Sequence, residues 1–152
     1  MPVAYVDIPS NLNMDTKKRL VKEVADSIHD AYAIGDTRVF LREWSPDQTS
    51  IDGEVGGLRP ICTFVVPPGL HGEGKGRLVK RVRDAISSAC NLPRVDVPLP
   101  SGKKITTTWV LSFFTEVPLE QAALDDLMAY ENPMVIEGME AAVQMQKKRA
   151  QG

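Results

Sequence analysis

The sequence has few of the residue types that build metal centres and disulfide frameworks. It contains only two cysteines and two histidines among 152 residues. Neither Cys62 nor Cys90 has a second cysteine or a histidine at the spacing of metal ligands, so we expect no metal site. Both cysteines lie in apolar surroundings, which predicts buried thiols in a reducing compartment and a cytoplasmic protein.

Long apolar runs and a strong excess of one charge are also missing. No stretch approaches the roughly 18 apolar residues that a membrane-spanning helix needs, and MPVAYVDIPSN at the start lacks the features of a secretory signal. The net charge of -2 does not favour a nucleic-acid-binding or membrane-surface protein. The chain length and the 43% of hydrophobic residues predict one folded domain.

The sequence does contain an internal repeat. Residues 17–32 (KKRLVKEVADSIHDAY) and 75–90 (KGRLVKRVRDAISSAC) align without gaps at an offset of 58, and the same offset pairs Pro2 with Pro60. Ungapped agreement of this kind indicates duplication and fusion of one unit. The identical pairs are Lys17/Lys75, Arg19/Arg77, Leu20/Leu78, Val21/Val79, Lys22/Lys80, Val24/Val82, Asp26/Asp84, Ile28/Ile86 and Ala31/Ala89.

Each unit has the pattern of a strand, a helix and a second strand. The strand segments are rich in β-branched and aromatic residues, and the helical segments carry apolar residues at helical spacing. Asp15 is the expected N-cap of the first helix, and Gly35 lies just past its end. The predicted strands are 2–9, 38–44, 60–67 and 109–117, and the predicted helices are 15–33 and 73–90.

A strand–helix–strand run of this length implies parallel pairing through a right-handed crossover. Two such units predict an α/β fold, in which a four-stranded sheet carries two helices on one face. The closing strands align through Glu43 and Glu116 at an offset of 73, so the second unit has about 15 extra residues, expected to form a loop or short hairpin. We expect a single domain with units at about 2–53 and 60–118 and a helical tail at 119–152, interrupted near Pro133.

Pro2, this order of elements and the segment RVFLREW (38–44) resemble the tautomerase superfamily, the first unit being similar to 4-oxalocrotonate tautomerase. The full length, His29, GLHGEGK (69–75) and WVLSFFTEVP (109–118) look more like the fused members around cis-3-chloroacrylic acid dehalogenase. The resemblance covers about residues 2–118. It implies a cofactor-independent enzyme that uses an N-terminal proline and assembles as a homotrimer.

The resemblance also implies site residues. The dehalogenase group uses an N-terminal proline, a histidine on the first helix, two arginines after the third strand, a tyrosine and a glutamate. By position these fall on Pro2, His29, Gly72, Lys75, Phe113 and, by an ungapped count, Leu124. Two residue types are kept and one arginine is replaced by lysine, which argues against efficient dehalogenation. The family pattern further implies that Arg38 binds a carboxylate, in a neighbouring subunit's site, and Arg42 on the same strand face is a second candidate.

Pro2 becomes a secondary amine when the initiator methionine is removed. An α-amino group titrates at about pH 8, and burial or cations such as Arg38, Arg42 or Lys75 favour its neutral form. A neutral amine is a suitable general base for moving a proton next to a carbonyl, provided that a cation or a hydrogen-bond donor stabilises the enolate. Pro60 is an internal imide without a basic nitrogen, so the second unit is expected to supply binding groups only.

Most of these residues also have a purely structural explanation. Met-Pro beginnings are common, His29 fits a surface histidine, and Arg38 and Arg42 fit solvated arginines of an edge strand. GLHGEGKG (69–76) nearly matches a phosphate-binding loop, but Gly76 stands where the motif needs Ser or Thr, which disfavours nucleotide hydrolysis. Its glycines and Lys75 remain suited to a substrate carboxylate at a helix N-terminus.

The sequence therefore predicts keto–enol tautomerisation of a small 2-oxo acid, or hydration of an unsaturated acid, with Pro2 as general base or acid. Two alternatives stay open: hydrolytic dehalogenation of a cis-3-haloacrylate, and a non-catalytic trimeric scaffold or ligand-binding protein. The expected partners are a small carboxylate substrate and two further copies of the chain.

Overall fold

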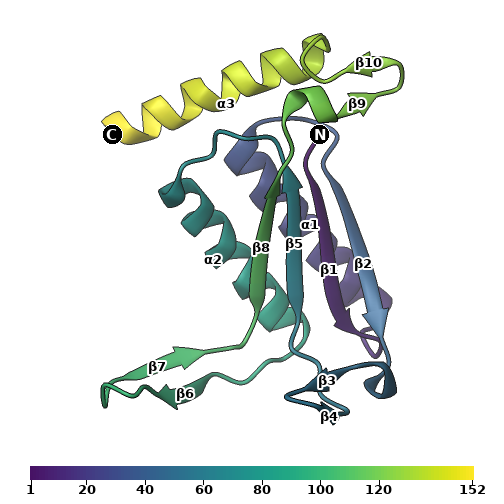
Figure 1. The fold of residues 1–152 in the computed structure, drawn as a ribbon, viewed down its shortest axis with the longest axis vertical. Helices are drawn as coiled ribbons and strands as arrows, with labels where there is room; N and C mark the ends of the chain where they lie inside the picture. The colour runs from purple at the N-terminus through teal and green to yellow at the C-terminus, as the bar shows by residue number, and fades with distance from the viewer.

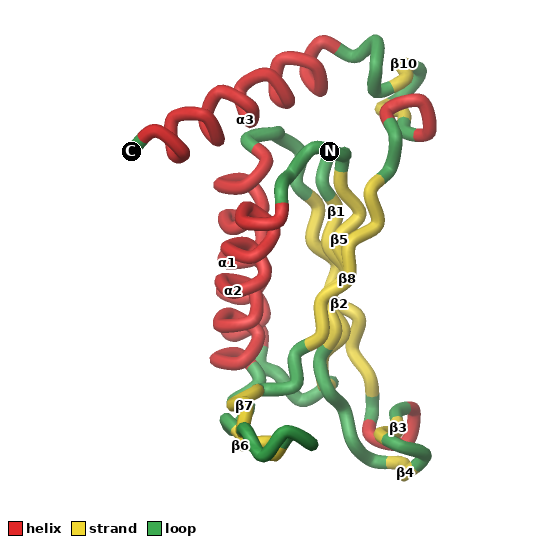
Figure 2. Tube along the Cα trace, turned by 60° about the vertical axis from the view of Figure 1, so that its left-hand side comes forward, coloured by secondary structure: helices red, strands yellow, loops and turns green.

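Two long helices pack on one face of a four-stranded sheet in the computed structural model, which describes residues 1–152 (Figure 1). In sheet order, the strands are β2 (Arg38–Trp44), β1 (Val3–Pro9), β5 (Ile61–Val66) and β8 (Leu111–Glu116). The helices on the sheet are α1 (Met14–Tyr32) and α2 (Gly72–Ala89). Seen edge-on, these helices form one layer and the strands form another (Figure 2), which confirms the predicted α/β fold.

The two units join at the centre of the sheet. Within each unit the strands pair in parallel, β1 with β2 and β5 with β8, and the intervening helix makes the crossover, as predicted. Between the units, β1 and β5 run antiparallel, with Val3 opposite Val65 and Asp7 opposite Ile61. The first strands of the two units therefore begin at opposite ends of the sheet.

The strand beginnings of the two units are built alike. The backbone N–H of Arg38 donates to the carbonyl oxygen of Pro2 at 3.0 Å, and the N–H of Leu111 donates to that of Pro60 at 3.1 Å. Leu111 follows Arg38 at the offset of 73 that relates the closing strands. This agreement supports the duplication inferred from the repeat.

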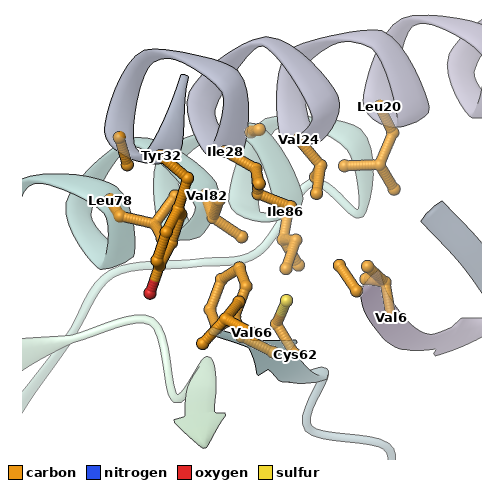
Figure 3. Close-up of a cluster of buried hydrophobic side chains, with 14 of the residues drawn as sticks. Val6, Leu20, Val24, Ile28, Tyr32, Cys62, Val66, Leu78, Val82 and Ile86 are labelled. Atoms are coloured by element: carbon orange, nitrogen blue, oxygen red, sulfur yellow. The ribbon is translucent and has the colours of Figure 1, made fainter. Parts of the chain in front are cut away.

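The core fills the space between the helices and the sheet (Figure 3). Strand side chains alternate between the two faces, so every second residue of β1 and β5 points at the helices. The repeat-related Ile28 and Ile86 are both fully buried, and a side chain of this size contributes about 1.5–3 kcal/mol when it is buried. Cys62 is buried as predicted, and burial raises the pKa of its thiol to about 12, whereas Cys90 is only half-buried.

The opposite face of the sheet carries large apolar side chains that one chain leaves uncovered. Phe40 is 49% exposed, Leu111 is 49% exposed and Phe113 is 51% exposed. Tyr5 stacks against Phe40 with ring centroids 5.4 Å apart. An exposed apolar surface of this kind indicates an interface with another molecule.

The repeat continues beyond the closing strands. After β2 the chain forms the 3-10 turn η1 (Pro46–Gln48) and a hairpin of β3 (Ser50–Ile51) and β4 (Glu54–Val55). After β8 it forms η2 (Leu119–Gln121), β9 (Ala123–Leu124) and β10 (Leu127–Met128). Each of these elements lies 73 residues after its counterpart. The two hairpins lie at opposite ends of the sheet, β3–β4 beside the end of β2 and β9–β10 near the N-terminus (Figure 1).

The expectation of helix from residue 119 onward is therefore wrong for 119–128. Asp125 adopts a left-handed backbone with φ of 53°, as its counterpart Asp52 does with φ of 52°. Aspartate tolerates this conformation and favours turns, so Asp125 closes a hairpin within a segment whose other residues favour helix. The helical tail is confirmed for α3 (Pro133–Gln151), which begins where the Asn132 side chain accepts a hydrogen bond from the N–H of Met134 at 3.0 Å.

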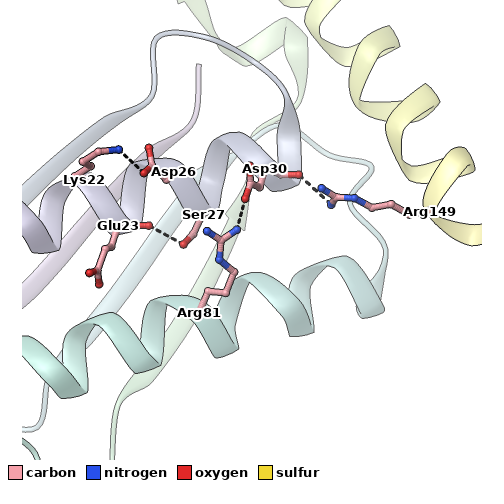
Figure 4. A network of polar contacts seen from close by, with 7 residues as sticks. All are labelled: Lys22, Glu23, Asp26, Ser27, Asp30, Arg81 and Arg149. Carbon is pink, nitrogen blue, oxygen red and sulfur yellow. Dashed lines mark hydrogen bonds and ion pairs between the residues drawn. The ribbon is translucent and has the colours of Figure 1, made fainter. Parts of the chain in front are cut away.

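Helix α3 crosses the ends of α1 and α2 (Figures 1 and 2). Arg149 donates to the carbonyl oxygen of Asp30 at 3.1 Å, and the carboxylate of Asp30 accepts from Arg81 of α2, so one residue of α1 contacts both other helices (Figure 4). The extra residues of the second unit form a separate hairpin, β6 (Val95–Pro98) with β7 (Lys104–Thr107). None of the helices combines the length and the apolar character that crossing a bilayer requires.

The sequence predicts Asp15 as the N-cap of α1, but the N-cap is Asn13. The side chain of Asn13 accepts a hydrogen bond from the N–H of Thr16 at 2.9 Å, and Asp15 lies in the first turn. At the other end the chain turns at Ala33, whose φ is 53° and whose N–H donates to the carbonyl oxygen of His29 at 2.8 Å. The helix thus ends at Tyr32, three residues before Gly35.

Substituting the two candidate caps separates these assignments. Asn13→Ala is expected to lower the free energy of unfolding by about 1 kcal/mol, because the N–H of Thr16 loses its acceptor. Asp15→Ala removes only a charge near the positive end of the helix and is expected to cost about 0.3 kcal/mol in moderate salt. Urea unfolding followed by circular dichroism measures both, and the reverse order would place the cap at Asp15.

Candidate active site

A pocket of about 340 Å³ lies at the end of the sheet where the chain begins. Met1 and Arg38 line it together with the end of β5, and the segment from η2 to β9 covers it. The lining is mainly apolar, and Arg38 is the one charged side chain in it. The pocket therefore places an amine and a guanidinium between mainly apolar walls.

Three effects act on the N-terminal amine in this pocket. Burial lowers the pKa of the Met1 amine below its ordinary value of 8.0, because the charged form loses solvation. The Asp36 carboxylate raises that pKa, and the Arg38 guanidinium lowers it. Burial dominates, so the neutral amine is present at lower pH than for a free N-terminus and is able to accept a proton there.

Asp36 and Arg38 form an ion pair beside the amine. Arg38 donates to Asp36 through Nη2 at 2.8 Å and through Nε at 3.2 Å, and this hydrogen bonding lowers the pKa of the Asp36 carboxyl. Asp36 has a left-handed backbone with φ of 54°, which turns the chain into β2 and brings its carboxylate to Arg38. The half-exposed guanidinium retains N–H groups that a substrate carboxylate is able to reach.

The structure brings together only some of the predicted site residues. Pro2 is buried at the start of β1, bonded through its carbonyl oxygen to the N–H of Arg38 in the same chain. His29 is exposed in the last turn of α1, Gly72 is the first residue of α2, and Phe113 lies on the open sheet face. None of these four residues lines the pocket, although Pro2 lies between Met1 and Val3, which do, and their roles stay predictions.

Two further predicted residues are engaged elsewhere. Arg42 donates to Asp7 at 2.6 Å and lies four residues, or about 13 Å, along β2 from Arg38. Lys75 forms an ion pair with Glu116 at 2.5 Å. Within one chain, neither side chain lines the pocket that holds the N-terminus.

The Lys75–Glu116 pair has a counterpart in the first unit. Lys17 pairs with Glu43 at 2.7 Å, and both partners are the repeat equivalents of Lys75 and Glu116. In each unit the pair joins the first turns of the helix to the end of the closing strand. Because both units retain this ion pair, it is explained by the fold. Glu116 already pairs with the Lys75 ammonium that sequence reasoning assigned to a substrate carboxylate.

Sequence reasoning missed the segment that covers the pocket. Leu124, where the ungapped count placed the family's glutamate, does line the pocket, but it offers no carboxylate. The signal that would have identified the covering hairpin was present, because Gln48 matches Gln121 and Asp52 matches Asp125 at the offset of 73. No pattern singled out Asp36.

Opposite shifts are expected when the two charged neighbours of the amine are removed. Arg38→Gln should raise the pKa of the N-terminal amine, because a repelling cation is lost, and Asp36→Asn should lower it, because an attracting anion is lost. The pH dependence of acylation of the N-terminal amine, quantified by peptide mass, measures this pKa. Arg94→Gln, at the far end of the molecule, is the matched control, and equal shifts in all three variants would contradict the assignment.

No family model and no curated protein match the sequence, but solved structures match the fold. A symmetric trimer of wild-type fused 4-OT aligns over 85% of this chain and 97% of its own, with a TM-score of 0.70 and 18% identity. Pt0534 inactivated by 2-oxo-3-pentynoate aligns over 83% and 94%, with a TM-score of 0.63 and 16% identity. Malonate semialdehyde decarboxylase, described with decarboxylase and hydratase activities, aligns over 80% and 89%, with a TM-score of 0.58 and 14% identity. The chain thus has the tautomerase fold in its fused form, with two β-α-β units in one polypeptide.

Proposed function

We propose that the protein is a cofactor-independent enzyme of the tautomerase superfamily that acts on a small 2-oxo or unsaturated carboxylic acid. After removal of Met1, the Pro2 amine is the general base or acid. The observation that carries this proposal is that the chain begins in an apolar pocket beside Arg38, where burial lowers the pKa of the Met1 amine. Two of the structural neighbours engage small acids with a carbonyl group: one is a malonate semialdehyde decarboxylase, and Pt0534 is inactivated by 2-oxo-3-pentynoate.

For a 2-oxo acid, the proposed steps are two proton transfers. Arg38 binds the carboxylate, and the neutral amine takes a proton from the carbon next to the carbonyl. The C–H electrons form the new carbon–carbon double bond, and the carbonyl electrons move to oxygen as an enolate. The ammonium then returns the proton to that oxygen, giving the enol, and the reverse sequence gives the ketone. Arg38 stabilises the enolate charge more strongly in an apolar pocket than in water.

The repeat offers a matched pair of variants for this proposal. Pro2→Ala is expected to lower kcat/KM for ketonisation of phenylpyruvate enol by about 10²–10⁴-fold, the usual contribution of a positioned general base. Pro60→Ala changes the repeat-related proline, which has no free amine, and is expected to retain the activity. An intact mass without Met1 establishes beforehand that the amine is free. Equal loss in both variants, or full activity in Pro2→Ala, would contradict the assignment. A processed wild-type protein with no activity would favour the non-catalytic alternative.

We further propose that the protein is a homotrimer assembled through the open face of the sheet. The uncovered Phe40 and Phe113 supply the apolar contact area, and β2 and β8 are edge strands whose outer backbone groups have no partner strand within the chain. The fused 4-OT structures with this fold are trimers, and closed rotational symmetry allows identical copies to bury such a face completely.

Light scattering after size-exclusion chromatography tests the trimer. The wild-type protein is expected to have three times the chain mass of 16.7 kDa. Phe40→Glu buries a charge in the proposed interface and is expected to give monomers. Ile105→Glu is the matched control, because Ile105 is similarly exposed at 47% but lies on the β6–β7 hairpin, away from the sheet face. A trimer that survives Phe40→Glu would place the interface elsewhere.

A further inference from the structure

A second and larger pocket, of about 780 Å³, lies at the opposite end of the sheet, where β5 begins. It is related by the internal repeat to the first pocket, which Met1 and Arg38 line. Arg59 precedes Pro60 and lines this pocket, as Met1 precedes Pro2 and lines the first. Ser50 and Ile51 of β3 line it, as Ala123 and Leu124 of β9 line the first. The two hairpins lie at opposite ends of the sheet (Figure 1).

The walls of the two pockets correspond residue by residue. The segment from η1 to β3 lines the second pocket at positions that lie 73 residues before the lining of the first. The corresponding pairs are Trp44/Val117, Gln48/Gln121, Thr49/Ala122, Ser50/Ala123 and Ile51/Leu124. The fold therefore builds two related cavities, although the second is larger and is also lined by Thr107 of β7.

The catalytic groups of the first pocket are absent from the second. The nitrogen of Pro60 is part of a peptide bond and cannot accept a proton. Leu111 occupies the position of Arg38, so the guanidinium beside β2 has no equivalent. Trp109 stands where the first unit has Asp36, and both residues have a left-handed backbone, with φ of 61° and 54°. The indole of Trp109 before β8 thus takes the place that the Asp36 carboxylate has before β2.

The second pocket has binding groups of its own. The Arg59 guanidinium lies over the Trp109 ring, 4.1 Å from its centroid. Asp7, the other charged residue of the lining, is 7% exposed and accepts from Arg42 at 2.6 Å and from Nε1 of Trp44 at 2.7 Å. The Asp7 carboxylate therefore already has Arg42 as its cationic partner, whereas Arg59 forms no ion pair.

We propose that this pocket is a non-catalytic binding site for a small aromatic carboxylate. The carboxylate pairs with Arg59, whose guanidinium keeps its N–H edge available while its face stacks on the indole. The ring of the ligand packs against Trp44 and Trp109, which are 37% and 38% exposed in the empty protein. The volume lies in the range of ordinary small-molecule sites. The proposal does not depend on the chemistry of Pro2.

The two tryptophans make the site directly observable. Trp44 and Trp109 are the only tryptophans of the chain, and both line this pocket. Titration of the full-length protein with phenylacetate is expected to change tryptophan emission in a saturable way. Arg59→Gln should weaken the apparent Kd at least tenfold, and Arg19→Gln, an exposed arginine on α1, should leave it unchanged. Phenylacetamide, which has the same ring without the charge, should bind at least tenfold more weakly than phenylacetate.

The outcomes separate this site from the first pocket at the N-terminus. Pro2→Ala should bind phenylacetate with unchanged affinity and emission change, even where it loses all activity. No saturable response in the wild-type protein would overturn the proposal, as would an unchanged Kd in Arg59→Gln or equal binding of the amide. A response that disappears in Pro2→Ala would assign the binding to the first pocket instead. Because the readouts are fluorescence and turnover, either proposal can fail without the other.

Discussion

The antiparallel pairing of β1 with β5 determines the layout of the whole molecule. Each unit by itself is a pair of parallel strands with one helix, and its sheet has a single face to bury. The central pairing joins the units so that α1 and α2 cover one continuous face and share one core. It also sends Pro2 and Pro60 to opposite ends of the sheet, which separates the two pockets by the length of a strand, about 20 Å.

Much of the fold could be predicted because the repeat reports each element twice. Apolar positions that recur at an offset of 58 identified both helices and the strands before them. The cap of α1 could not be predicted with the same certainty, since Asn13 and Asp15 are both good caps and only the backbone geometry decides between them. The β9–β10 hairpin was missed because Asp125 is followed by Asp126, without the glycine that marks the turn after Asp52, and leucine, alanine and methionine around it favour helix.

The candidate site was predictable where it depends on backbone position and unpredictable where it depends on side-chain pairing. Pro2 and Arg38 lie at one end of the sheet because they precede and begin adjacent strands, whereas the resemblance had implied that Arg38 serves a neighbouring subunit's site. The engagement of Lys75 by Glu116 required knowledge of the end of β8. In retrospect, a residue kept in both units is a candidate for a structural role. A residue that differs between the units, such as Arg38 against Leu111, is a better candidate for function.

The β6–β7 hairpin shows how one end of a duplicated protein is able to diverge without cost to the other. It is inserted between α2 and β8 and extends away from the sheet (Figure 1), and Trp109 follows it directly. The entropy lost on closing a loop grows only with the logarithm of its length, so 15 added residues change the stability of the sheet little. Unit two has thereby gained a new wall for its pocket, while the shorter connection of unit one still holds Asp36 beside the N-terminus. Because only the second unit has the longer connection between its helix and its closing strand, the two ends of the duplicated sheet differ.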